Sequence, residues 1–148
     1  MSKHARVSFE DTLNVRDNCL CLYLQRAARV VARHFDEALR PFDLTNGQFS
    51  LLMSLNRPDP PTIGMISITL GVDRTTLTAG LKPLERRGLL TVAIDEADKR
   101  GRRLALTPGG HALLMRALPV WKSNHALIEQ RLKPSSPDTF RDELRALS

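Results

Sequence analysis

The sequence predicts a mainly α-helical fold with one small β-hairpin, which places it in the α+β class. Apolar residues at helical spacing between residues 62 and 88 predict two short helices joined by a tight turn. Alternating apolar residues on both sides of a charged segment predict the hairpin at residues 89–107. Apolar stripes before residue 41 and after residue 107 predict longer helices at both ends of the chain.

A long helix is expected from about Thr12 to Leu39, after a loose arm that covers residues 1–11. Its apolar stripe follows steps of three or four residues and consists of Leu20, Leu24, Ala27, Val31, Phe35 and Leu39. Further apolar side chains widen this stripe beyond what a surface helix needs to cover its own domain. We therefore expect a partner subunit to cover part of it. Pro41 ends the helix.

A second helix is expected to begin after Thr45, because Thr45 and Gln48 have the spacing of a capping box. Its buried face is expected to consist of Phe49, Leu52 and Leu55. The proline-rich segment at residues 57–61 ends this helix and leads to Thr62, the expected N-cap of the next one.

The third and fourth helices form a helix–turn–helix. The third is expected over residues 63–70, with Gly71 in the left-handed conformation that ends many helices. Asp73 is expected to cap the fourth helix by accepting backbone N–H bonds. The buried face of that helix is Leu77, Leu81 and Leu84, and Gly88 ends it.

The hairpin follows at once. Leu90, Val92 and Ile94 alternate with smaller side chains, and Leu104 and Leu106 repeat the alternation on the returning strand. The segment between the strands, residues 95–101, is too polar to be buried and is expected to be an exposed tip. The hairpin therefore forms a wing beside the helix–turn–helix.

The C-terminal part is predicted to be helical. Thr107 followed by Pro108 is a strong helix start, and the helix is expected to continue through Leu132. Pro134 stops it, and a short last helix is expected from Pro137 through Leu147.

Composition is that of a single soluble chain with a basic surface. The net charge is +6 and the pI is near 10.0, which favours a polyanionic partner without distinguishing nucleic acid from a membrane surface. No apolar run approaches the roughly 18 residues that span a bilayer. The N-terminus also lacks the apolar segment of a secretory signal, so we expect a cytoplasmic protein without a membrane partner.

Three segments together resemble the DNA-binding core of the MarR family of bacterial transcriptional regulators. They are LTNGQFSLL (residues 44–52), DRTTLTAGLKPLERRGLL (residues 73–90) and DEADKRGRRLALT (residues 95–107). The resemblance covers roughly Cys19 to Leu114. It implies a winged helix-turn-helix DNA-binding lobe at residues 44–107. It also implies a homodimer formed by intertwined helices from residues 12–41 and 108–148, the whole chain 1–148 being one unit of the family.

The resemblance implies double-stranded DNA as the partner, bound at a near-palindromic operator because a dimer presents two recognition helices. The fourth helix would be the recognition helix in the major groove. Its first residues would contact base edges there, and they are Arg74, Thr75, Thr76 and Thr78. Lys82 lies further along and would reach phosphates. The wing supplies Lys99, Arg100, Arg102 and Arg103. In the family's wing motif, Asp98 and Arg100 form a salt bridge, and the arginine approaches the minor groove.

Members of the family commonly respond to small molecules, often phenolic or anionic, or to oxidation of a cysteine. A small aromatic or anionic effector is therefore expected. Cys19 with Tyr23 one turn later is similar to the organic-hydroperoxide sensors of the family, although Tyr23 is the only tyrosine here. The alternative is that Cys19 and Cys21 are inert and buried in a dimer helix. On a helix their side chains would point about 200° apart, so they could not form a disulfide with each other.

The sequence therefore predicts a sequence-specific DNA-binding regulator, a repressor that a small molecule releases. One alternative is a thiol-based oxidant-sensing repressor that uses Cys19. Further alternatives are an architectural protein that coats DNA without sequence preference and a protein-interaction module. The histidines and cysteines lack metal-ligand spacing, and no catalytic motif is visible. We expect neither a metal, nor a cofactor, nor an enzyme.

Overall fold

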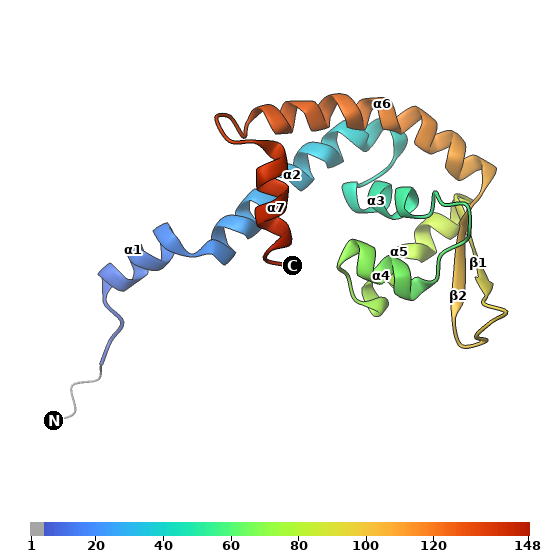
Figure 1. The fold of residues 1–148 in the computed structure, drawn as a ribbon, viewed down its shortest axis with the longest axis horizontal. Helices are drawn as coiled ribbons and strands as arrows, with labels where there is room; N and C mark the ends of the chain where they lie inside the picture. The colour runs from blue at the N-terminus through green and yellow to red at the C-terminus, as the bar shows by residue number, and fades with distance from the viewer. Residues whose placement is uncertain (1–4) are drawn as a thin grey trace. The chain divides into compact units, whose positions relative to one another are not determined.

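The computed structural model describes residues 5–148 and divides the chain into two compact units, residues up to His34 and Phe35–Ser148. Helices dominate, with one antiparallel hairpin, as predicted (Figure 1). The helices are α1 (Phe9–Asn18), α2 (Leu20–Leu39), the short 3-10 helix η1 (Arg40–Phe42), α3 (Asn46–Ser54), α4 (Ile63–Leu70), α5 (Arg74–Arg86), α6 (Pro108–Gln130) and α7 (Pro137–Arg145). The strands are β1 (Leu90–Ile94) and β2 (Arg102–Leu106).

The N-terminal unit contains α1 and most of α2, and it differs from the prediction in two respects. Helix α1 begins inside the predicted arm, because Ser8 and Asp11 form a capping box that starts it at Phe9. The beginning of the arm, residues 1–4, lies outside the described residues. The predicted single helix from Thr12 to Leu39 is also wrong. Cys19 has an extended backbone (φ −69°, ψ 107°) and separates α1 from α2, directly after two residues with low helix propensity.

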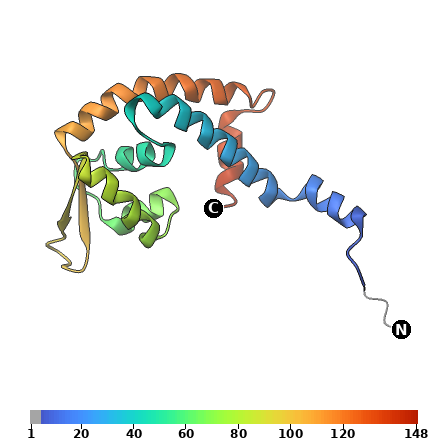
Figure 2. The same cartoon turned by 180° about the vertical axis from the view of Figure 1, so that it is seen from behind.

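Seven elements contribute to the core of the C-terminal unit, among them α6 with the completely buried Ala117. One leucine or isoleucine from each of α2, α3, α4, α5, β1 and β2 is almost completely buried: Leu39, Leu52, Ile66, Leu84, Leu90 and Leu104. The predicted buried faces of α3 and α5 are confirmed, because Phe49, Leu52, Leu55, Leu77, Leu81 and Leu84 are all buried. This shared core fixes the helix–turn–helix against the root of the hairpin (Figures 1 and 2).

The predicted starts of α3 to α7 are confirmed. Thr45, Thr62, Asp73, Thr107 and Ser136 each cap the helix that follows by accepting a backbone N–H bond. Gly71 ends α4 in the left-handed region, with φ at 66°. Two C-terminal ends fall short of the prediction. Helix α6 ends at Gln130, because the N–H groups of the next two residues bond to carbonyls only three residues back. Helix α7 ends at Arg145.

The first turn of α6 packs directly on the residue before β1. Gly110 is buried there, and a Cβ atom added to it would lie 2.1 Å from the carbonyl oxygen of Leu89. Only a residue without a side chain allows the two backbones this close approach. Gly110 thus sets the separation between the long C-terminal helix and the hairpin.

The predicted hairpin is confirmed, and its strands pair from Leu90 opposite Leu106 to Ile94 opposite Arg102. Its returning strand also contacts the connector between α3 and α4, where the Leu104 N–H donates to the Pro61 carbonyl over 2.9 Å. Among the described residues, no helix is both long enough and apolar enough to span a bilayer.

Candidate nucleic-acid interface

Helix α5 is held by its buried leucines and turns its other side to solvent. Leu77 and Leu81 are 3% exposed and Leu84 is completely buried. The residues expected to read DNA, Arg74, Thr75, Thr76 and Thr78, are all exposed, and so is Lys82. The helix is therefore anchored along one face while its N-terminal half remains open to a partner.

Asp73 fixes the first turn of α5. One of its carboxylate oxygens accepts the Thr76 backbone N–H and the other accepts the Thr76 hydroxyl, both over 2.8 Å. These hydrogen bonds, the backbone bond foremost, lower the pKa of Asp73 below its usual value. The hydroxyl proton of Thr76 is thus used within the cap. Of the four residues predicted to contact base edges, Arg74, Thr75 and Thr78 take no part in the cap with their side chains.

Arg74 extends toward α4. A Cβ atom on Gly64, in the first turn of α4, would lie 3.0 Å from a terminal nitrogen of the Arg74 guanidinium. The missing side chain at Gly64 therefore leaves the space that the guanidinium occupies. The two helices of the motif jointly define where this group lies.

The tip of the wing and the first residue of β2 together carry three exposed cations, Lys99, Arg100 and Arg102. The Arg100 Nε lies 3.9 Å from the Asp98 carboxylate, and both side chains are largely exposed. Asp98 also accepts the backbone N–H of Arg100 over 3.1 Å. Asp98 therefore shapes the tip through the backbone as well as through the expected ion pair, which at this exposure contributes little energy.

The base of the wing's tip, where Asp95 follows β1 and faces Arg103 of β2, holds an ion pair that the sequence analysis missed. Asp95 was predicted to lie in an exposed segment, but it is only 8% exposed. Its carboxylate lies 3.3 Å from the Arg103 Nε and accepts the backbone N–H of Ala97 over 3.1 Å. The prediction failed because hairpin pairing continues past Ile94, with the Asp95 N–H donating to the Gly101 carbonyl. Polarity alone does not reveal this pairing.

Arg103 joins the wing to the connector before α4. Its Nη1 donates to the Pro60 carbonyl over 2.8 Å, while its Nε faces Asp95. A single β-bridge between Thr62 and Arg103 reinforces the same contact. The only signal in the sequence was an acid and an arginine at opposite ends of the polar segment.

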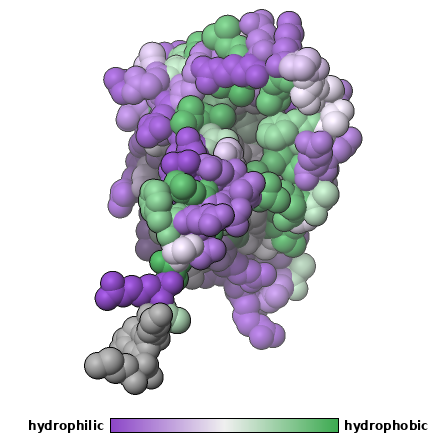
Figure 3. Space-filling view, turned by 90° about the vertical axis from the view of Figure 1, so that its left-hand side faces the viewer, coloured by the Kyte–Doolittle hydropathy of each residue, from purple (hydrophilic) through white to green (hydrophobic). Residues whose placement is uncertain are grey.

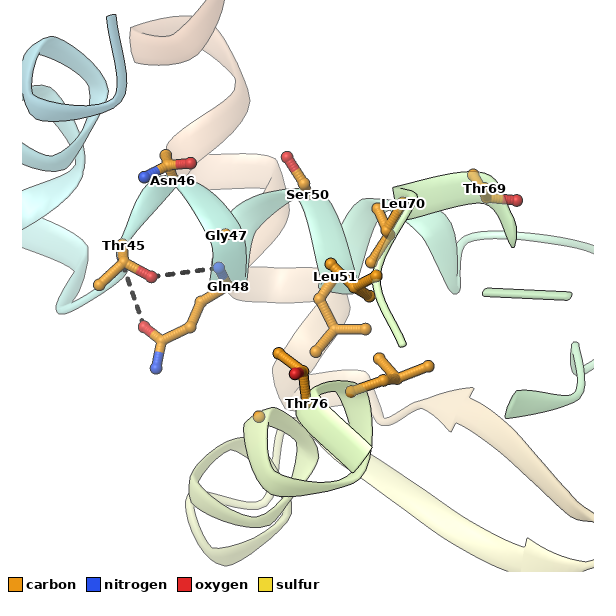
Figure 4. A pocket seen from close by; sticks show the side chains of 12 residues that line it. Thr45, Asn46, Gly47, Gln48, Ser50, Leu51, Thr69, Leu70 and Thr76 are labelled. Atoms are coloured by element: carbon orange, nitrogen blue, oxygen red, sulfur yellow. Dashed lines mark hydrogen bonds between the residues drawn. The ribbon is translucent and has the colours of Figure 1, made fainter. Parts of the chain in front are cut away.

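A pocket of about 570 Å³ lies among α3, α4 and α5 (Figure 4). Leu51 and Leu77 form a buried apolar part of its wall, and Thr69 and Thr76 contribute hydroxyl groups. Gln48 borders it at the start of α3, where its side chain accepts the Thr45 N–H (Figure 4). No residue that lines the pocket is charged. The pocket therefore suits an uncharged or aromatic group.

Both cysteines are free thiols. Cys19 is half-buried at the extended residue between α1 and α2, whereas Cys21 is exposed on α2, with the Gln25 amide 3.3 Å from its sulfur. Because Cys19 is not helical, the argument that a helix keeps the two thiols apart does not apply. Within residues 5–148, no group of three potential metal ligands comes together.

Comparison with known proteins agrees with this geometry. The sequence model of the MarR family matches residues 44–101, the segment from the start of α3 to the tip of the wing. The chain is 29% identical over 104 residues to the organic hydroperoxide resistance transcriptional regulator of Bacillus subtilis, which covers 70% of this chain and 71% of the relative.

Solved structures match over nearly the whole chain. The transcriptional regulator MosR of M. tuberculosis in complex with DNA has 35% identity and a TM-score of 0.80, over 88% of this chain and 93% of that one. BpsR of Bordetella bronchiseptica, whose DNA binding is regulated by 6-hydroxynicotinic acid, has 25% identity and a TM-score of 0.77, over 88% and 98%.

Proposed function

The chain belongs to the MarR family of transcriptional regulators, and on this premise we propose that it binds an operator in duplex DNA as a homodimeric repressor. The observation that carries the proposal is the exposed N-terminal half of α5 beside a wing with exposed cations. A recognition helix in the major groove and a basic wing along the backbone are the two contacts that this architecture makes available.

The two elements have different roles in the proposal. Arg74 is expected to pair with guanine, because a guanidinium fork matches the two acceptors of that base, and Thr75 and Thr78 offer methyl groups to thymine. Lys82 and the wing cations are expected to contact phosphates, which gives affinity without sequence preference. Binding should accordingly weaken as the salt concentration rises. In a plot of the logarithm of the binding constant against the logarithm of the salt concentration, each phosphate contact should contribute about −0.9 to the slope.

Alanine variants separate these roles. Arg74→Ala should lose affinity for the operator and keep its affinity for random duplex DNA, whereas Arg100→Ala should lose affinity for both. Arg6→Ala is the matched control: it removes one exposed positive charge before α1, outside both the winged lobe and the segments assigned to the subunit contact. Equal losses on operator and random DNA for both test variants would contradict the assignment.

The exposed apolar surface of α2 supports the homodimer. Leu20 is 70% exposed and Tyr23 49%, and Leu24 and Val30 are also open to solvent. Figure 3 shows hydrophobic residues at the surface among hydrophilic ones. We assign the subunit contact to residues 12–41 and 108–148. A dimer would present two copies of α5, so the operator should be a near-palindrome with half-sites about one helical turn apart.

A small aromatic or anionic molecule is the proposed effector. The pocket beside α5 offers one place for it, and its uncharged lining favours the aromatic class. An occupant would contact Thr76 and Leu77, and so would favour one placement of α5 over others. Its effect on the free energy of operator binding equals the difference between its binding free energies for the DNA-binding and the non-binding conformation of the protein, typically about 1–3 kcal/mol. Titration of neutral and anionic aromatic compounds against the operator complex tests this.

The second candidate is oxidant sensing through Cys19, favoured by its place at a break between two helices and by the organic hydroperoxide relative. A thiolate would attack the hydroperoxide, forming sulfenic acid on sulfur and releasing the alcohol. The test compares hydroperoxide sensitivity of operator binding in the native chain, Cys19→Ser and Cys21→Ser. Loss of sensitivity in Cys19→Ser alone supports this candidate, and equal sensitivity in all three chains rejects it.

A further inference from the structure

We propose that Asp95 is a positioning residue that strengthens DNA binding although it carries the same charge sign as the DNA. It would do so by holding Arg103 and thereby fixing the direction of the wing. This inference rests on the proposed function, because it concerns how the wing reaches a duplex.

The contacts at the base of the wing's tip form a connected chain. The Asp95 carboxylate faces the Arg103 Nε at 3.3 Å, and the Nη1 of the same guanidinium reaches the Pro60 carbonyl at 2.8 Å. The pair thus links the end of β1, through β2, to the connector that leads into α4. A guanidinium can make both contacts at once because its donors form a rigid planar fork.

Asp95 also organises the tip directly. Its carboxylate accepts the N–H of Ala97, and its own N–H donates to the Gly101 carbonyl. A Cβ atom on Gly101 would lie 3.5 Å from the Cβ of Asp95, so the two ends of the tip are in contact. The exposed cations Lys99 and Arg100 lie between these two ends. Their position therefore depends on the Asp95 contacts.

Burial distinguishes Asp95 from its neighbour Glu96. Asp95 is 8% exposed and its Arg103 partner is about one-third exposed, whereas Glu96 is exposed. The Asp98–Arg100 pair at the tip is open to solvent and lies at 3.9 Å, too weak to hold the wing by itself. The fixed ion pair of the wing is therefore Asp95–Arg103, at the base of its tip.

The sign of the effect tests the proposal. Asp95→Asn keeps the shape of the side chain and removes one negative charge close to the DNA. Electrostatics alone predicts tighter binding for this variant, whereas loss of the wing's position predicts weaker binding. Glu96→Gln is the matched control, because it removes the same charge from the adjacent exposed residue. Arg103→Lys is a second test variant: it keeps the charge but loses the fork.

The experiment measures the affinity of each variant, as a dimer below its unfolding temperature, for the selected operator and for random duplex DNA between low and moderate salt. We expect Asp95→Asn and Arg103→Lys to bind both DNAs more weakly. Their salt slopes should be shallower by about 0.9 for each phosphate contact that the wing loses. Glu96→Gln should bind as tightly as the native chain or more tightly.

A double-mutant comparison separates positioning from a general loss of stability. In a chain that carries both Lys99→Ala and Arg100→Ala, Asp95→Asn should cause no further loss of affinity or salt slope. The inference is overturned if Asp95→Asn binds as tightly as Glu96→Gln, or if its effect is unchanged without the wing cations. Because affinity for random duplex DNA is also measured, the test of Asp95 stands even if no operator is selected. That outcome would contradict the proposed sequence specificity but not the role of Asp95.

Discussion

Substitution of Gly110 by alanine should destabilise the C-terminal unit, although alanine is the better helix former. The new Cβ would lie 2.1 Å from the Leu89 carbonyl oxygen, and Cβ atoms in proteins essentially never approach another atom closer than 3.0 Å. The first turn of α6 and the residue before β1 must therefore separate by about 1 Å, an overpacking that typically costs about 1–3 kcal/mol. The same carbonyl accepts the Thr107 N–H, so the movement also strains that hydrogen bond.

Gly109→Ala is the matched control. It has the same gain in helix propensity, up to about 1 kcal/mol, but its Cβ would meet the Gly88 carbonyl oxygen at an ordinary 3.6 Å. Thermal unfolding followed by circular dichroism should show a lower Tm for Gly110→Ala, by about 2–4 °C for each kcal/mol, and an unchanged or higher Tm for Gly109→Ala. Equal Tm values for the two variants would refute the close approach of α6 to the hairpin.

Three other predictions concern the cap, the core and the dimer. Because the pKa of Asp73 is lowered in the folded chain, its contribution to stability is present above the unfolded value near 3.9 and is lost as the pH falls through the lower folded value. The native chain should therefore lose more stability on acidification than Asp73→Asn, and parallel acid titrations would contradict this. Leu84→Ala should cost about 2–5 kcal/mol in chemical denaturation, because Leu84 is completely buried, and a smaller loss would contradict its central place in the core. Leu20→Glu should shift the chain toward the monomer in light scattering, whereas Glu10→Gln on α1 should not, and an unchanged dimer in Leu20→Glu would remove α2 from the subunit contact.

The starts of α3 to α7 could be predicted from the sequence because capping is local, whereas the equally local capping box of Ser8 and Asp11 was overlooked within the predicted arm. Thr45, Asp73 and Thr107 each act on a backbone group within three residues, so spacing alone identifies them. The presence of the hairpin followed in the same way from alternation on two short strands, whereas its register was not predicted. The break at Cys19 was missed because the predicted apolar stripe begins only at Leu20, and periodicity does not report a single residue that leaves the helical conformation.

The Asp95–Arg103 ion pair at the base of the wing's tip was missed for a different reason. Burial of Asp95 depends on Arg103 across the tip and, through Arg103, on the connector at Pro60, which is distant in sequence and comes near only in the folded chain. The same holds for the approach of Gly110 to Leu89 and of Arg74 to Gly64. Such contacts leave no periodic pattern, whereas the exposed cations of α5 and the wing are visible from charge and spacing alone.

The central claim, that this chain recognises a particular DNA sequence, is tested most directly by selecting genomic fragments with the purified native protein and footprinting the most enriched one. We predict a protected near-palindrome with two half-sites about one helical turn apart, and loss of that protection in Arg74→Ala. Enrichment of no fragment at low salt, or equal affinity for the enriched fragment and a random duplex, would contradict the claim.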